Sequence, residues 1–294
     1  MITIIAMTWK EMLRKRVMLL TLLMTGIFLL AFWFVAQTIG IGLQTPAGGG
    51  EASVSYLIER FKLGAIIIAL GFFFGSFVTA FLSIFSSFSS VAGEAEQGVL
   101  LALLPRPLAR WRWYMGRWIG YVTLGGGYSL LIFVSILLIA RFHAAIPLDL
   151  LLLVKAFLLF AWTVPLLVSV SMLGSCIFSA LGNGVFMTML FGAGWLGGMI
   201  EKVAGSLLAR DASLQPLKTI AGLMSLVMPA DAIQQRMLSE MFSLSAIKEL
   251  MNINDVLGPF GLGQEPTNAF LLYTACYTLA ALGLGLWVFQ RKDL

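Results

Sequence analysis

The feature that most constrains this chain is a recurring set of apolar stretches that carry almost no charge. A helix needs about 20 such residues to cross roughly 30 Å of bilayer hydrocarbon at 1.5 Å per residue. The stretches lack the alternation of polar and apolar residues that outer-membrane strands show, so helices are the expected spanning element. Charged residues make up only 11% of the chain, against about 25% in soluble domains. The sequence therefore predicts an all-α integral membrane protein.

Six stretches have the length and apolarity of transmembrane helices. They run from about Val17 to Gln37, Gly64 to Ser90, Trp118 to Ala140, Leu151 to Ala180, Gly184 to Ile200 and Ala269 to Gln290. The Pro and consecutive glycines of LQTPAGGGEAS predict a flexible outer loop over residues 37–62. Cys176 and Cys276 fall at different depths, so no disulfide is expected. No second soluble domain is visible, and residues 1–294 are expected to form one membrane domain.

The distribution of basic residues predicts that both termini are cytoplasmic. One side of the predicted membrane carries Lys10, Arg14, Lys15, Arg16, Arg106, Arg110, Arg112, Arg117, Arg291 and Lys292. The other side has fewer, namely Arg60, Lys62 and Arg141. The net charge of +5 is explained by orientation and by contact with lipid headgroups. Membrane lipid is therefore an expected partner, and nucleic acid is not.

The first 16 residues are predicted to form an amphipathic helix in the cytoplasmic interface. Apolar residues recur at helical spacing, at Ile2, Ile5, Trp9, Met12 and Leu13. The charged residues Lys10, Glu11, Arg14 and Lys15 fall on the other side. A simple orientation signal with a lipid-facing stripe is the alternative interpretation.

Residues 91–117 are predicted to form a cytoplasmic loop with a short helix. Glu94 and Glu96 can begin this helix, and Pro105 and Pro107 end it. Its leucines, Leu100, Leu101 and Leu104, provide one apolar side. An acidic helix with a leucine ridge is suited to dock into a groove of another protein. The alternative is a solvated loop whose leucines have no partner.

Small hydroxyl residues recur at three- and four-residue steps along the second predicted span. They are Ser76, Thr79, Ser83, Ser86 and Ser87. One face of small hydroxyl residues lets another helix approach closely and form hydrogen bonds. The same face could line a substrate path, so both packing and pathway roles stay open.

The segment 201–268 is the only long polar stretch, and the topology places it outside the cytoplasm. Its apolar run is too short to span, so we expect short helices that lie at the outer surface or dip partway into the membrane. Just before this segment, Gly194 and Gly198 lie four residues apart in FGAGWLGG. This spacing favours close contact between helices.

Several chemistries are disfavoured by missing residues. The sequence has no GxxxxGK[ST] phosphate loop, so we expect no ATP hydrolysis by this chain. The single histidine, His143, has no partners near it in sequence for a metal site. Lys155 is the only charged residue within the predicted spans, which argues against ion-driven transport and against an intramembrane enzyme.

The segment GEAEQGVLLALLPRPLARWRWYMGRWIG resembles the cytoplasmic loop of ABC-type-2 permeases. Glu94, Gly98, Leu101 to Leu104, Pro107, Arg110 and Gly120 carry the resemblance. The N-terminal WKEMLRKR, the segment VMPADAIQQRM and the terminal FQRKDL agree in order. The sequence is most similar to a subgroup that includes the permease of the nitrous-oxide-reductase maturation system and peptide-antibiotic resistance exporters. One departure is Arg117, because common members carry Lys where the chain enters the third span.

The resemblance implies a permease subunit in a bacterial or archaeal cytoplasmic membrane. It would pair with a separate ABC ATPase and with a second permease copy, with a homodimer favoured over a heterodimer. ATP and magnesium would bind to the partner ATPase, and this chain would hold no cofactor. The residues that the resemblance assigns to the ATPase contact are Glu94, Glu96, Gly98, Leu101, Leu104, Pro107, Arg110, Lys10, Glu11 and Arg14. We expect Glu94→Lys to detach or uncouple the ATPase and to leave membrane insertion intact.

Export of a substrate is therefore the main functional hypothesis. The alternative is a subunit that transmits ATP-driven motion to an extracytoplasmic partner through residues 201–268, without moving a solute. The substrate class is not evident from the sequence, because such cavities are lined by ordinary apolar and hydroxyl side chains.

Overall fold

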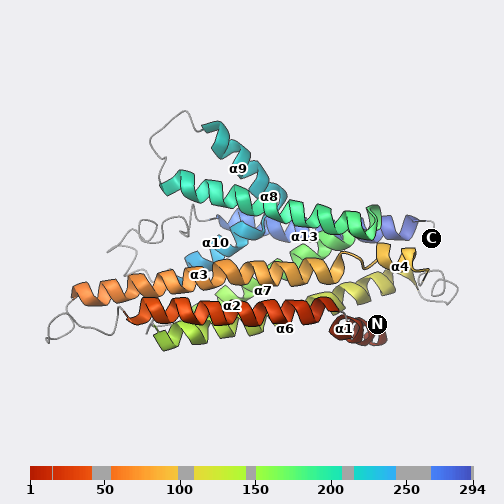
Figure 1. Ribbon diagram of the computed structural model, residues 1–294. Helices are drawn as coiled ribbons and strands as arrows, with labels where there is room; N and C mark the ends of the chain where they lie inside the picture. The colour runs from red at the N-terminus through yellow and green to blue at the C-terminus, as the bar shows by residue number, and fades with distance from the viewer. Residues whose placement is uncertain are drawn as a thin grey trace.

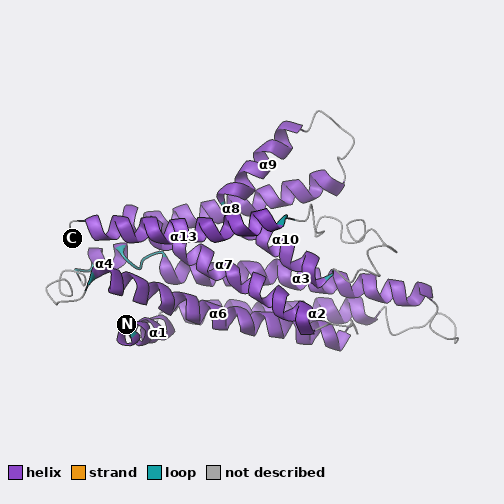
Figure 2. Ribbon diagram, turned by 180° about the vertical axis from the view of Figure 1, so that it is seen from behind, coloured by secondary structure: helices purple, strands orange, loops and turns teal. Residues whose placement is uncertain are grey.

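The computed structural model describes residues 1–14, 16–41, 54–98, 109–143, 150–206, 215–242 and 266–292. Every regular element in these ranges is a helix (Figure 1 and Figure 2). In chain order they are α1 (Ile2–Arg14), α2 (Arg16–Ile41), α3 (Val54–Ser87), α4 (Ala92–Glu96), α6 (Arg110–His143), α7 (Leu150–Ile177), α8 (Ala180–Ser206), α9 (Gln215–Val227), α10 (Ala230–Met241) and α13 (Asn268–Arg291).

The prediction of six spanning helices is confirmed. Six helical segments of the described residues are long and apolar enough to cross a membrane. They are Met18–Gly40, Phe61–Glu96, Arg110–His143, Leu150–Ile177, Ala180–Lys202 and Asn268–Arg291. Together they make the chain an integral membrane protein of the all-α class.

Both termini lie at the same end of the bundle, together with α4 (Figure 1). We call this the termini end. The short helix α1 lies across it (Figure 1 and Figure 2) and packs against α6 and α2. Ile2 and Leu13 of α1 remain exposed, as expected for a helix that lies in a membrane interface.

Two predicted loops are shorter in the structure than the sequence suggested. The loop expected over residues 37–62 is shortened at both ends, because α2 continues to Ile41 and α3 begins at Val54. The loop expected over residues 91–117 ends earlier, because α6 begins at Arg110. No Pro lies between positions 107 and 146, so the aromatic and arginine residues at the membrane interface can extend this helix beyond its apolar part.

The helices of the segment 201–268 differ in their burial. Helix α9 packs along α8, whereas α10 lies against α7, α8 and α3. Ten of the twelve residues of α10 are buried. Of the two expected arrangements, α10 therefore adopts the one that enters the bundle, and Pro229 precedes its first turn.

The insertion of α10 overturns one prediction from the sequence. The sequence predicts Lys155 as the only charged residue within the spans, yet the spanning segments Arg110–His143 and Ala180–Lys202 contain the buried Arg117 and Lys202, and Asp231 of α10 is also buried. The polarity of residues 201–268 does not by itself predict exposure, because polar side chains that pair with one another can be buried.

The largest hydrophobic cluster lies among α2, α3, α6, α7 and α10. Three aromatic rings from three helices meet there: the Phe72 ring centroid lies 5.1 Å from that of Phe133 and 5.6 Å from that of Phe160. Cys176 is buried, Cys276 is exposed, and both are free thiols, in agreement with the prediction.

Candidate functional site

A buried arginine joins three helices at the termini end. Arg117 of α6 is 3% exposed and forms ion pairs with Glu11 of α1 and Glu94 of α4. Its Nη1 also lies 3.4 Å from the hydroxyl of Thr8, and its guanidinium stands 5.5 Å from the ring centroid of Trp113. We call Arg117, Glu11 and Glu94 the arginine node. The two carboxylates that were expected to face a partner protein thus have an intramolecular partner.

Helix α4 is fastened to two further helices. The hydroxyl of Ser175 in α7 accepts hydrogen bonds from the backbone N–H groups of Val91 and Ala92, each at 3.0 Å. Glu96 Oε1 accepts the Ala180 N–H at 2.9 Å, and its negative charge is favourable at the N-terminus of α8. Helix α4 is consequently linked to α6, α7 and α8 by specific hydrogen bonds or ion pairs.

Helix α1 approaches α6 closely at two glycines. A side chain at Gly116 would collide with Ile4, and one at Gly120 would collide with Thr8. The Trp9 indole N–H adds a 3.0 Å hydrogen bond to the hydroxyl of Thr123. The contacting residues Ile4, Thr8 and Glu11 recur at helical spacing, so a mixed apolar and polar face of α1 meets α6.

The remaining residues predicted to contact an ATPase have different positions. Lys10 and Arg14 are exposed on α1. Arg110 donates hydrogen bonds to the carbonyl oxygens of Gln290 and Lys292 at 3.1 and 2.9 Å, at the C-terminal end of α13. Gly98 follows α4 with φ +70°, a conformation that favours glycine. Leu101, Leu104 and Pro107 lie outside the described residues.

The predicted hydroxyl face of α3 is mostly buried. Thr79, Ser83, Ser86 and Ser87 are each at most 5% exposed. Their hydroxyls donate to carbonyl oxygens three or four residues earlier in α3 itself. Ser76 does the same toward Phe73, but it also borders a cavity.

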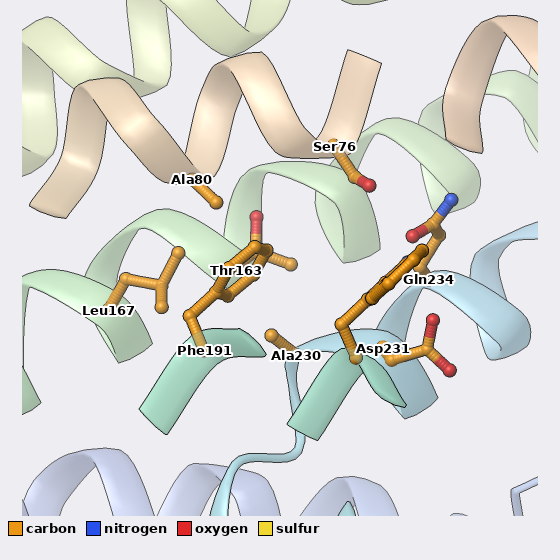
Figure 3. Close-up of a pocket in the computed structure, with 9 residues that line it drawn as sticks. Ser76, Ala80, Thr163, Leu167, Phe191, Ala230, Asp231 and Gln234 are labelled. Carbon is orange, nitrogen blue, oxygen red and sulfur yellow. The ribbon is translucent and has the colours of Figure 1, made fainter. Parts of the chain in front are cut away.

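That cavity lies where α3, α7, α8 and α10 meet, and it has space for roughly one water molecule. Figure 3 shows Ser76, Thr163, Asp231 and Gln234 around it. Trp195 also lines the cavity, and its buried indole N–H has no hydrogen-bond acceptor among the described residues. At this cavity the predicted hydroxyl face meets open space through Ser76.

A polar cluster that the sequence analysis did not predict adjoins this cavity. Lys202 Nζ of α8 lies 3.0 Å from Asp231 Oδ1 of α10. Gln235 Nε2 donates to Asp231 Oδ2 at 2.8 Å, and Gln234 Nε2 donates to the Phe72 carbonyl of α3 at 3.0 Å. The signal was present in ADAIQQ, since positions 231, 234 and 235 share one helical face.

The glycines of FGAGWLGG in α8 lie in close contact with the end of α9 and the start of α10. A side chain at Gly194 would collide with Met228, one at Gly197 with Met224, and one at Gly198 with Asp231. The prediction that Gly194 and Gly198 mark a close helix contact is therefore confirmed. The contact is made within the chain, by Met224 of α9, Met228 between the two helices and Asp231 of α10.

The fold and these sites define a polytopic helical membrane protein with structural ion pairs at two levels of its bundle. Among the described residues, no group of His, Cys, Asp and Glu could hold a metal ion. The chain belongs to the family described as ABC-2 family transporter protein, which it matches over residues 4–294. It is thus a permease of the ABC-2 type. A search of curated proteins finds none that matches the chain.

Proposed function

We propose that this chain is the membrane-spanning subunit of an exporter driven by a separate ABC ATPase. Its membership of the ABC-2 family over residues 4–294 carries the proposal. The sequence contains no phosphate loop of its own, so ATP and magnesium would bind to the partner, and this chain would need no cofactor. The subunit would lie in a bacterial or archaeal cytoplasmic membrane with both termini in the cytoplasm, where ATP is available.

The termini end is the surface that we assign to the ATPase. Helices α1 and α4 both lie there (Figure 1). Exposed polar side chains there include Lys10 and Arg14 of α1, Glu96 of α4 and Gln97, which follows α4. Helix α4 is tied to α6, α7 and α8, so a partner that displaces α4 would act on three spanning helices together. This arrangement suits a subunit that converts motion of a soluble ATPase into motion of a membrane bundle.

A second copy of the permease would complete the transporter, with the translocation path opening alternately to the two sides of the membrane. Ser76 and the cavity beside it are the part of the hydroxyl face that we assign to the path. Resemblance to the maturation permease and the peptide-antibiotic exporters suggests the direction of transport. The burial of α10 places part of the segment 201–268 inside the bundle, so we favour export over transmission to an extracytoplasmic partner.

The test is to purify the tagged protein from its native membranes in mild detergent and to identify what is recovered with it. The expected partner is a soluble ATPase with a phosphate loop. Gln97→Arg, at the exposed residue that follows α4, should reduce the recovery of this ATPase. The matched control is Gln37→Arg, an exposed glutamine of α2, which should leave recovery unchanged.

Gln97 is a better position for this test than Glu94. Glu94 is 8% exposed and is paired with Arg117, so Glu94→Lys would place two cations side by side and disturb the bundle itself. Recovery of the chain alone, under conditions that preserve other membrane complexes, would contradict the proposed function.

A further inference from the structure

We propose that Arg117 is the positioning residue through which ATPase motion reaches α6. This inference rests on the proposed function, because it assigns the route by which a docked ATPase acts on the permease. Arg117 forms ion pairs with one residue of α1 and one of α4, the two short helices of the termini end. It belongs to α6, a spanning helix of 34 residues.

The chemistry of the node requires an arginine. The two carboxylates come from different elements, and each meets a different Nη atom of one guanidinium. A guanidinium offers five N–H donors in a rigid planar fork and keeps its charge at all relevant pH values, whereas a lysine ammonium is a single point charge on a flexible stem. Lysine could neutralise the carboxylates, but it could not hold both in a fixed geometry.

The surroundings of the node make it stiff. Arg117 is 3% exposed and Glu94 is 8% exposed, so water screens their attraction much less than it does at a surface. Loss of the Arg117 charge would leave the buried Glu94 carboxylate without the cation that pairs with it. Ile4 and Thr8 pack against the glycines on either side of Arg117 in α6, so α1 cannot slide along α6 without a steric clash.

These contacts turn three separate helices into one mechanical unit. An ATPase that moves α4 must carry Glu94 with it, and Glu94 moves Arg117 and therefore α6. The same argument applies to α1 through Glu11. Arg117 is the only residue of the described chain that forms ion pairs with both α1 and α4.

The first test needs no ATPase. Thr8 is fully buried against α6, so a Thr8→Cys thiol in a Cys276→Ser background should react slowly with a maleimide in native membrane vesicles. Arg117→Gln should accelerate this reaction about tenfold or more, the factor that corresponds to about 1.4 kcal/mol of lost stabilisation. Arg112→Gln is the matched control, since Arg112 is an exposed arginine of the same helix.

Two milder variants separate the arms of the node. Glu11→Gln should expose the Thr8→Cys thiol and leave the hydrogen exchange of α4 unchanged. Glu94→Gln should accelerate exchange in α4 and leave the thiol protected. General loss of folding would move both readouts together. An unchanged thiol reactivity in both Arg117→Gln and Glu11→Gln would overturn the proposal.

The second test uses the complex recovered with its ATPase. Trapping with ATP and vanadate should change hydrogen exchange along α6 in the parent complex. In Arg117→Gln the ATPase should still be recovered and still hydrolyse ATP, but the change along α6 should disappear, and Arg117→Lys should retain part of it. A full response of α6 in Arg117→Gln would refute the assigned route. Failure to recover any ATPase with the parent protein would instead contradict the proposed function and leave the thiol test valid.

Discussion

Replacing Lys202 by methionine should destabilise the bundle far more than replacing both members of its ion pair. The Lys202 and Asp231 side chains are each 4% exposed. Lys202→Met removes the cation and leaves the Asp231 carboxylate with Gln235 as its one remaining hydrogen-bond donor in the described structure. Removing one partner of a buried pair costs about 3–5 kcal/mol, because the other charge stays buried without compensation.

The companion variant Lys202→Met with Asp231→Asn removes both charges. The asparagine oxygen can still accept the hydrogen bond from Gln235, so no buried donor loses its acceptor. Replacing a complete buried pair with neutral residues is often close to neutral in stability. Most of the loss caused by Lys202→Met should therefore be recovered in the double variant.

The assay is thermal inactivation in detergent, followed by fluorescence-detected size-exclusion chromatography. A loss of about 3–5 kcal/mol corresponds to a fall in Tm of roughly 6–20 °C, at about 2–4 °C per kcal/mol. Lys155→Met is the control, because Lys155 is an exposed lysine of a neighbouring helix, and its Tm should not change. If the double variant falls as far as the sum of the two single variants, the two charges do not interact and the reasoning is wrong.

Three glycine-to-alanine and two serine-to-alanine changes test other contacts. Gly198→Ala should lower stability by about 1–3 kcal/mol, since its Cβ would collide with Asp231, whereas Gly192→Ala in the same helix has free space and should raise stability by up to about 1 kcal/mol. Gly98→Ala also has free space, but its φ of +70° should make it destabilising by about 1–2 kcal/mol; a positive shift in Tm would contradict this. Ser175→Ala should accelerate hydrogen exchange at the start of α4, because two N–H groups lose their acceptor, and Ser129→Ala, which removes a bond within α6, should leave α4 unchanged.

The spanning helices could be predicted from the sequence because membrane insertion depends on local composition. Long charge-free stretches are sufficient to find them, and all six were found. The ends of α3 and α6 could not be placed as well, since a helix can continue beyond the hydrocarbon into the interface without an apolar signal. Charge and apolarity therefore located the membrane and did not locate the helix ends.

The partners of individual side chains could be predicted much less well. The sequence marks Glu94 and Glu11 as candidate ATPase contacts. Their common partner Arg117 lies 23 residues from Glu94 and 106 residues from Glu11. Such pairing depends on how helices pack, and local sequence does not encode it. Asp231 was missed for the same reason, because its charge is compensated by Lys202 from another helix.

The hydroxyl face of α3 has a consequence for movement. Thr79, Ser83, Ser86 and Ser87 donate their hydrogen bonds to their own helix, so these donors form no directional bond that would lock α3 to a neighbour. Contact across this face depends on van der Waals packing of small side chains. This packing has no preferred direction, so similar contacts can form again after a helix rotates or shifts along its axis. This face of α3 therefore holds its neighbours by van der Waals contact, without hydrogen bonds from these four hydroxyls. Its neighbours can shear past it without first breaking a hydrogen bond at these four positions.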